Sequence, residues 1–382
     1  MIRRIGILLL ALAGLAQTAL AGQFKMPVYY DMGRHNNLPL SIVSADFNSD
    51  GNLDLAVADF GTGVIKILLG KGDGTFTFGK SFSVPAFVSN LAVGDFNGDH
   101  KLDLAVVEYG GTGLSGMAIF LGNGDGTFKD SGFYQLGVEA LSAAVADFSG
   151  DGHLDIAVTN EGNNGNGNVM VFFGKGDGTF RKPTIYNLPN YPYSVAAADL
   201  NGGDGYADLV VAQAGSVGSV TVLLNAGGGK FRKAGVYAVR GGPTNVAIAD
   251  LNHDGIPDLA VATFEAVGVL LGKGGGKFDK AVLYSTKSIS QEGNPYAVVV
   301  ADFNGDGNPD IATVVDASSI AGLFYGKGNG TFGPVVPIRL RSATSGDAIT
   351  AGSYDNDRPP DLAIAISTGR QGGQVAVLLN AR

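Results

Sequence analysis

Acidic side chains recur along this chain in one short pattern. The first copy, residues 46–54, reads Asp-Phe-Asn-Ser-Asp-Gly-Asn-Leu-Asp and has oxygen-bearing side chains at its first, third, fifth and ninth positions. Calcium is bound in proteins by oxygen ligands, and the backbone carbonyl of the seventh residue can add one more. Glycine at the sixth position allows the tight turn that such a loop needs. The pattern therefore predicts a calcium-binding loop.

The pattern occurs in six copies at intervals of about 51 residues. One copy alone could be an ordinary turn, because Asp, Asn and Gly are common turn residues. Recurrence in six copies favours metal binding, with about six Ca²⁺ ions. The predicted metal ligands are Asp46, Asn48, Asp50, Asp54, Asp95, Asn97, Asp99, Asp103, Asp147, Ser149, Asp151, Asp155, Asp199, Asn201, Asp204, Asp208, Asp250, Asn252, Asp254, Asp258, Asp302, Asn304, Asp306 and Asp310.

The copies differ in detail. The second has His100 in place of the glycine, the third has Ser149 at its third position, and the fourth contains one extra residue. A seventh copy, residues 353–361, begins with Ser353 and has Arg358 where the glycine stood. We expect no calcium in this seventh loop, with the Arg358 guanidinium neutralising the remaining acids.

Four short apolar or polar runs surround each acidic loop. Val alternating with Ala precedes the loop, as in residues 194–198, and a mostly apolar run that includes the loop's last aspartate follows, as in residues 53–58. A third run (residues 64–69) leads into a glycine-rich turn (residues 70–76) and then a more polar fourth run. Alternating and continuous apolar runs of this length predict β-strands. Four antiparallel strands per repeat are typical of a β-propeller blade.

The two ends of the chain complement each other. Residues 24–30 resemble the fourth strand of a repeat, such as residues 180–186, and residues 375–380 resemble a third strand with no fourth strand after it. A linear solenoid is the structural alternative, but pairing these ends would remove an exposed edge. We therefore predict an all-β fold: a seven-bladed β-propeller of four-stranded antiparallel blades, closed by N-terminal and C-terminal strands in one blade.

Residues 1–21 have the features of a secretory signal peptide: two arginines, an apolar run and small residues at the end. The apolar run is too short for a membrane span. We expect a secreted protein, periplasmic or extracellular, with a single domain over residues 22–382. Removing Arg3 and Arg4 from 26 basic residues leaves 24 against 35 acidic ones, so the net charge changes from −9 to −11. Nucleic acid is therefore an unfavourable partner, and the absence of cysteine excludes disulfides.

The Asp-x-Asn-x-Asp-Gly-x-x-Asp loop, the apolar strand after it and the Gly-x-Gly-x-Gly-x-Phe turn resemble FG-GAP (VCBS-type) repeats. Such repeats form the blades of integrin alpha-subunit propellers and of many secreted bacterial proteins. The resemblance covers residues 24–382 and implies calcium bound between the first and second strands of a blade. Proteins of this family have different functions, so the resemblance implies a fold and a metal rather than a task.

If calcium fixes one end of the blades, ligand binding is expected on the opposite face, where the connecting segments vary most. Variable loops on a rigid scaffold commonly carry binding sites. The candidate ligand-binding residues are Glu108, Tyr109, Glu161, Asn163, Tyr191, Tyr193 and Glu265. We expect a binding or adhesion module for an extracellular glycan or protein, although the absence of tryptophan weakens the carbohydrate-binding interpretation.

Two other functions remain open from the sequence. A propeller-based polysaccharide lyase or hydrolase is one, but three of the four histidines lie in acidic loops, which leaves only His35 for a Ser-His-Asp triad. A structural envelope or matrix component is the other. The sequence alone indicates neither a catalytic group nor an oligomeric state.

Overall fold

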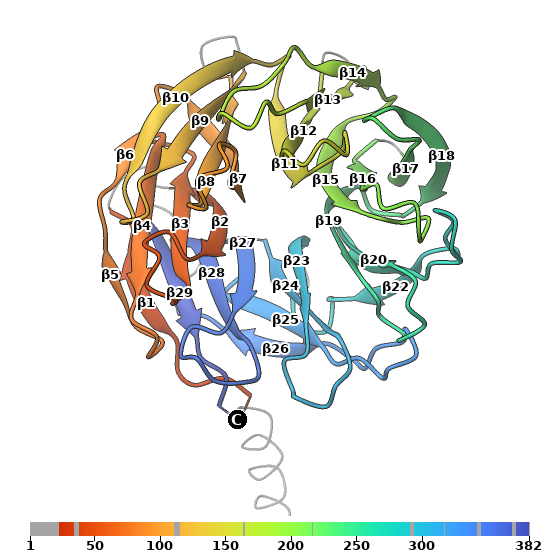
Figure 1. Cartoon of the computed structure of the whole chain (residues 1–382). Coiled ribbons are helices and arrows are strands. Elements are labelled where there is room, and N and C mark those ends of the chain that lie inside the picture. Colours follow the sequence, from red (N-terminus) through yellow and green to blue (C-terminus); the bar gives the residue numbers. More distant parts are fainter. Residues whose placement is uncertain are drawn as a thin grey trace, which may run out of the picture.

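The structure is a computed structural model that describes residues 23–33, 38–110, 115–162, 165–215, 217–290, 294–316, 318–341, 345–368 and 372–381. In these ranges the chain forms seven antiparallel sheets arranged in a ring around a central axis (Figure 1). The described residues contain no α-helix, and none of them form a helix long and apolar enough to cross a bilayer. The predicted seven-bladed β-propeller is confirmed. The predicted signal peptide and Asn163 lie outside the described residues.

Each blade is a sheet whose first strand lies nearest the axis. The first two blades contain β2 (Pro39–Ala45), β3 (Asp54–Asp59), β4 (Val64–Gly70) and β5 (Phe76–Phe78), with β6 (Phe82–Ser83) also paired to β4, and then β7 (Phe87–Gly94), β8 (Asp103–Tyr109), β9 (Gly116–Gly122) and β10 (Phe128–Gln135). The next two contain β11 (Ala140–Ala146), β12 (Asp155–Asn160), β13 (Asn168–Phe172) and β14 (Thr184–Asn187), and then β15 (Pro192–Ala198), β16 (Asp208–Gln213), β17 (Ser219–Asn225) and β18 (Phe231–Ala238).

The last three blades complete the ring. They contain β19 (Pro243–Ala249), β20 (Asp258–Thr263), β21 (Ala266–Leu270) and β22 (Val282–Ser285); β23 (Pro295–Ala301), β24 (Asp310–Val315), β25 (Ile320–Phe324) and β26 (Val336–Arg339); and β27 (Ser345–Gly352), β28 (Asp361–Ser367), β29 (Gly373–Leu378) and β1 (Val28–Asp31).

The last blade combines the two ends of the chain. Strand β1 pairs antiparallel with β29, placing Val28 opposite Val377, and Phe24 forms a further bridge to Asn380. The backbone N–H of Lys25 donates to the carbonyl of Leu379 at 2.7 Å. The ring is therefore closed as predicted, and β29 has no free edge.

The first strands contact one another around the axis, which explains their small residues. Polar side chains on these strands also join neighbouring blades. The Ser41 hydroxyl oxygen accepts the N–H of Leu91 at 3.0 Å, and the Asn245 amide oxygen accepts the N–H of Val298 at 3.0 Å. Each such bond satisfies a backbone group that would otherwise be unpaired between two sheets.

Aromatic residues pack across each blade boundary. Phe47, from the first acidic loop, lies against Phe128 of the next blade with ring centroids 5.6 Å apart, and Phe96 lies against Phe180 in the same way. The N–H of Gly126 in the glycine-rich turn donates to the Phe47 carbonyl at 3.0 Å. Each of these acidic loops therefore contacts the turn of the following blade.

Candidate functional site

The last residue of each acidic loop is a fully buried aspartate that connects the loop to the third strand. In the first loop the Asp54 carboxylate accepts the N–H of Phe47 at 2.9 Å and the N–H of Gly70 at 2.7 Å. Burial raises the pKa of Asp54 to about 6, although these two hydrogen bonds act in the opposite direction. The same paired contacts recur at Asp103, Asp155, Asp208, Asp258, Asp310 and Asp361.

The first, third and fifth side chains direct their oxygens toward the loop backbone. The Asp46 carboxylate accepts the N–H of Asp50 at 3.2 Å and of Gly51 at 2.9 Å, and the Asn48 side-chain oxygen accepts the Asp50 N–H at 3.0 Å. Asp50 in turn accepts the N–H of Asn52 at 2.8 Å, and this bond lowers the pKa of Asp50. Gly51 has a φ of 87°, a conformation that favours glycine. These oxygens are therefore ordered within one turn.

The irregular loops keep this arrangement. His100, in the glycine position of the second loop, adopts a φ of 65°, and its N–H still donates to Asp95 at 2.8 Å. In the fourth loop the turn accommodates the extra residue: Asn201 Nδ2 still donates to Asp204, which is shifted by one position, at 2.8 Å. The second and fourth loops consequently offer the same kinds of donor atoms as the first.

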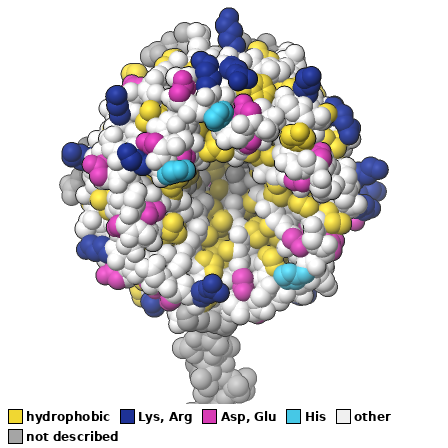
Figure 2. Space-filling model, in the orientation of Figure 1, with side chains coloured by type: hydrophobic (Ala, Val, Ile, Leu, Met, Phe, Trp, Pro, Cys, Tyr) yellow, Lys and Arg dark blue, Asp and Glu magenta, His cyan; other side chains and the backbone are white. Residues whose placement is uncertain are grey.

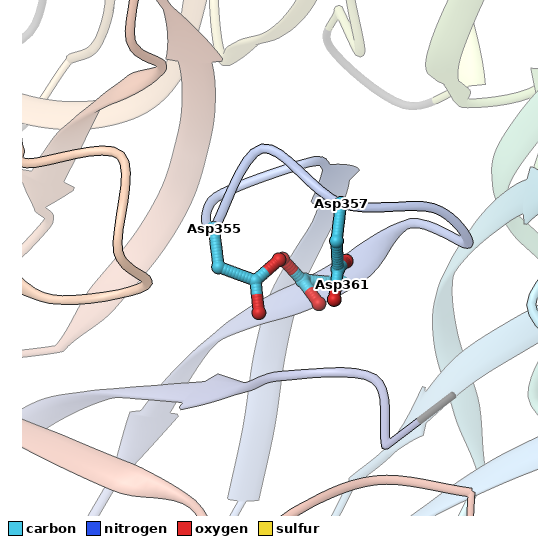
Figure 3. Close-up of side chains that lie close together, drawn as sticks. All are labelled: Asp355, Asp357 and Asp361. Carbon is cyan, nitrogen blue, oxygen red and sulfur yellow. The ribbon is translucent and has the colours of Figure 1, made fainter.

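The seventh loop differs from the other six. Carboxylate oxygens of Asp355, Asp357 and Asp361 lie within 4.8 Å of one another (Figure 3), which is the only such acidic group found in the described chain. One oxygen of Asp355 and one of Asp357 are buried without a hydrogen-bond partner. A hydrogen-bonding contact with Asp355 raises the pKa of Asp357. These oxygens form a site of concentrated negative charge.

A lysine, not the expected arginine, faces this charge. Lys25 Nζ lies 3.4 Å from Asp355 Oδ2, whereas Arg358 forms no ion pair with any described residue. The expectation that Arg358 neutralises the loop is therefore wrong. Ring closure explains the difference, because it places the N-terminal segment that carries Lys25 beside the last blade.

The donor atoms of the first six loops fit calcium chemically. All are carboxylate, amide or hydroxyl oxygens, which a hard divalent cation prefers over nitrogen or sulfur ligands. Each carboxylate oxygen has a second lone pair beside the one that accepts a loop N–H. The carboxylates at positions one, five and nine lie farther apart than in the seventh loop, so a bound ion would draw these side chains inward. Calcium there would supply positive charge at the blade boundaries.

A second feature lies on the ring axis. A cavity of about 450 Å³ is lined by the beginnings of first strands and by the ends of second strands. The acidic loops connect the other ends of these antiparallel strands, so the cavity opens on the opposite face. Figure 2 shows the ring from the acidic-loop face. The described histidines, His100, His153 and His253, all lie in acidic loops, and histidine side chains are visible on the face shown. We call the cavity the axial pocket.

A β-bulge at the start of each first strand shapes the axial pocket. In β15, for example, Pro192 and Ser194 face Gln213 and Ala212, so Tyr193 is an extra residue between them. A bulge changes the direction of a side chain and is common beside binding sites. Equivalent residues of all seven blades occupy these bulges and line the pocket: Leu40, Ser89, Leu141, Tyr193, Thr244, Tyr296 and Asp347.

Comparison with known proteins agrees with this architecture. A family model described as "FG-GAP-like repeat" matches residues 38–106, 107–158, 147–202, 203–261 and 250–313. The chain belongs to the FG-GAP repeat proteins. No curated protein sequence matches this FG-GAP repeat protein.

Solved structures resemble the FG-GAP propeller in fold. One is an Agrocybe aegerita lectin whose title describes recognition of non-reducing terminal N-acetylglucosamine: identity is 22%, the TM-score is 0.56, and the match covers 90% of this chain and 86% of that one. Another is BBS1N in complex with ARL6DN, with 13% identity, a TM-score of 0.60 and coverage of 94% and 98%. A third is Saccharomyces cerevisiae Sqt1, with 10% identity, a TM-score of 0.58 and coverage of 94% and 99%.

The FG-GAP propeller brings three of the seven candidate ligand-binding residues together. Tyr109, Glu161 and Tyr193 line the axial pocket. Glu108 is only 3% exposed and is buried within its blade, while Tyr191 and Glu265 are absent from the pocket lining.

Tyr296 ends a connecting segment that varies between repeats but was not among the candidate residues, and neither were Asp347, which also lines the pocket, or Glu139, which lies beside it. Burial, together with the nearby Glu139 carboxylate, raises the pKa of Tyr109 to about 12. Aligning the seven repeats at the start of the first strand would have placed Tyr296 and Asp347 beside Tyr193. That alignment gives no sign of the bulge that turns all three toward the axis.

Proposed function

We propose that this FG-GAP repeat protein is a secreted, calcium-stabilised propeller that binds an extracellular glycan or protein through the axial pocket. The observation that carries the proposal is the set of seven bulges. Each bulge directs one residue into a shared concavity, while the surrounding blade positions repeat. A rigid ring with variable residues at one concave site is suited to recognition.

Calcium is assigned a structural role at the opposite face. The acidic loops contact the glycine-rich turn of the following blade, for example through the Gly126 N–H and the Phe47 carbonyl. An ion in each of the first six loops would neutralise its carboxylates and hold that boundary in place. The seventh loop is proposed to use the ammonium group of Lys25 instead. Calcium would thus stabilise the ring without taking part in ligand binding.

Binding is favoured over glycoside hydrolysis by the position of the nearest carboxylate pair. Glu139 and Glu161 are opposite each other on paired segments, and the nearness of Glu139 adds to burial in raising the pKa of Glu161. The two carboxylates of a glycosidase typically lie about 5 to 9.5 Å apart, so that the sugar or a water molecule fits between them. A self-associating structural component can be distinguished from a monomeric binding protein by light scattering, because its molecular mass would rise with protein concentration.

The test uses the calcium-loaded protein on a glycan array and in pull-down experiments with extracellular proteins. Wild type should bind a defined set of ligands, and Tyr193→Ala should remove that binding. Glu265→Ala is the matched control, because Glu265 is exposed and lies outside the pocket lining. Blank arrays and pull-downs with folded, calcium-loaded wild type would overturn the proposal. Mass spectrometry of the exported protein should place its N-terminus at Gly22.

A further inference from the structure

The axial pocket combines acidic and aromatic groups. Its lining includes Glu161 and Asp347 together with Phe60, Tyr109, Tyr193 and Tyr296, and it includes no described Lys, Arg or His. The pocket is enclosed by seven blades and is of a size typical for small ligands rather than for a flat protein interface. Its charge and shape therefore restrict what it can bind.

Glu161 of the pocket lining lies opposite Glu139, a residue beside the pocket, across neighbouring strands. The N–H of Glu161 donates to the Glu139 carbonyl at 2.9 Å, and the N–H of Gly162 donates to the Val138 carbonyl at 3.2 Å. Antiparallel pairing therefore places both side chains on the same side of the sheet. Burial and then the nearby Glu139 carboxylate raise the pKa of Glu161, and burial and then the two carboxylates raise the pKa of Tyr109. Like charges directly opposite each other are destabilising. A cation between them would remove that repulsion.

A second acidic group lies in another part of the lining. The Ser345 hydroxyl is 2.8 Å from Asp316 Oδ1 and 2.7 Å from Asp347 Oδ1, and it connects the two carboxylates. Ser367 also donates to Asp347. Asp347 is held in place by these contacts and adds negative potential to the pocket. Ligands with negative charge are therefore disfavoured.

Aromatic side chains supply the remaining walls. Phe60 and Tyr109 have ring centroids 5.8 Å apart, and the side chains of Tyr193 and Tyr296 lie near each other in the lining. Tyrosine has an apolar face for a sugar ring and a hydroxyl for its polar groups. Many serines, threonines and asparagines of the lining already join blades, as Thr244 does by donating to the Tyr296 carbonyl at 2.8 Å. The groups left for a ligand are mainly tyrosines and carboxylates.

We propose that the axial pocket binds an amino sugar, with the protonated amine of the sugar at the Glu139–Glu161 pair and the ring against the tyrosines. This inference rests on the proposed function and specifies its ligand class. A protonated amine offers three N–H donors and one positive charge, which would offset the repulsion between the two glutamates. N-acetylation removes that charge, so the acetylated sugar should bind poorly.

The test is isothermal titration of the calcium-loaded full-length protein with three probes. These are a glucosamine tetramer, the N-acetylglucosamine tetramer of the same length, and lysine amide. The glucosamine tetramer should bind at least about tenfold more tightly than the other two, the difference expected for one charge-assisted contact. Glu161→Gln should weaken its binding by about tenfold, and Glu265→Gln should leave it unchanged. Added salt should weaken wild-type binding more than that of Glu161→Gln.

The outcomes separate this inference from the proposed function. Equal affinity for the amino and acetylamino tetramers, or an unaffected Glu161→Gln variant with a normal melting curve, overturns the amino-sugar assignment. Lysine amide binding as tightly as the glucosamine tetramer overturns the sugar part of it. Binding of neutral glycans on the array without any glucosamine binding rejects the inference and leaves the proposed function standing. Failure of every ligand on the array and in titration rejects both.

Discussion

The Asp54 carboxylate accepts a 2.7 Å hydrogen bond from the backbone N–H of Gly70, the last residue of the third strand in the same blade. Asp54 is fully buried, and its other oxygen accepts the N–H of Phe47. The acidic loop thus serves two purposes within one motif. Its last aspartate supports the blade, while its first, third and fifth residues present side-chain oxygens in the turn.

Replacing Asp54 should destabilise the protein even without calcium. Asp54→Ala leaves two buried N–H groups unpaired, and we expect a loss of about 2 to 6 kcal/mol in the free energy of unfolding. Asp50→Ala, in the exposed part of the same loop, is the control and should cost less than about 1 kcal/mol in excess chelator. Urea unfolding followed by circular dichroism measures both. Equal losses for the two variants in chelator would show that Asp54 has no separate structural role.

Calcium should raise the melting temperature of the protein. A ligand that binds only the folded state stabilises it by about 2.7 kcal/mol per site at a concentration one hundred times its dissociation constant. Thermal melts of wild type in excess calcium and in excess chelator measure the effect. Magnesium at the same concentration is the control and should give a smaller rise, because it favours stricter octahedral geometry. A melting temperature that is the same in calcium and in chelator would contradict the calcium assignment.

The number of bound calcium ions should be six. The seventh loop has lost its first carboxylate, and Lys25 Nζ lies 3.4 Å from Asp355 in that loop. Lys25→Ala removes this ammonium group and should allow a seventh ion to bind. One buried oxygen of Asp355 and one of Asp357 would then have no cation beside them. Native mass spectrometry or equilibrium dialysis counts the ions. Seven ions on wild type would show that Lys25 does not substitute for calcium.

The buried carboxyl group of Glu108 should make the free energy of unfolding decrease as the pH rises. Burial, reinforced by the charge of Asp130, raises the pKa of Glu108 in the folded state. The folded protein therefore binds this proton more tightly than the unfolded chain, so the contribution is present at acid pH and is lost as the pH rises through the raised pKa. Glu108→Gln removes that dependence.

The Glu108→Gln variant should consequently gain melting temperature over wild type at pH 7 and lose this gain near pH 4. Melting curves from pH 4 to pH 7 in excess chelator, which removes metal effects, provide the measurement. Glu265→Gln, at an exposed position, should show the same pH profile as wild type. A Glu108→Gln variant that is equally destabilised at every pH would assign Glu108 a hydrogen-bonding role instead.

Much of the fold could be predicted because each repeat carries its own signals. The acidic loop, the glycine-rich turn and the apolar runs define four strands, and the complementary ends at Phe24 and Asn380 define the closed ring. Tyr109 and Glu161 could be selected as pocket residues because they lie at or just after the end of a second strand, where connecting segments begin. These features depend on residues that are near one another in the sequence.

The missed features depend on contacts across the ring. A bulge adds one residue to a strand without a distinctive residue type, so nothing marked Asp347, or Tyr296 within its connecting segment, as a residue directed toward the axis. Lys25 reaches the seventh loop only after the ring has closed. The Glu139–Glu161 pair forms because one segment precedes β11 and the other follows β12, a relationship set by strand pairing.

The central claim is that the two faces have separate roles: calcium stabilises one, and the axial pocket on the other binds the ligand. Glycan-array binding in saturating calcium should therefore be compared for wild type, Tyr193→Ala and Asp50→Ala. We predict that Tyr193→Ala loses the wild-type signals while keeping its calcium-dependent melting temperature, and that Asp50→Ala keeps the signals. Ligand signals that survive Tyr193→Ala but disappear with Asp50→Ala would contradict the account.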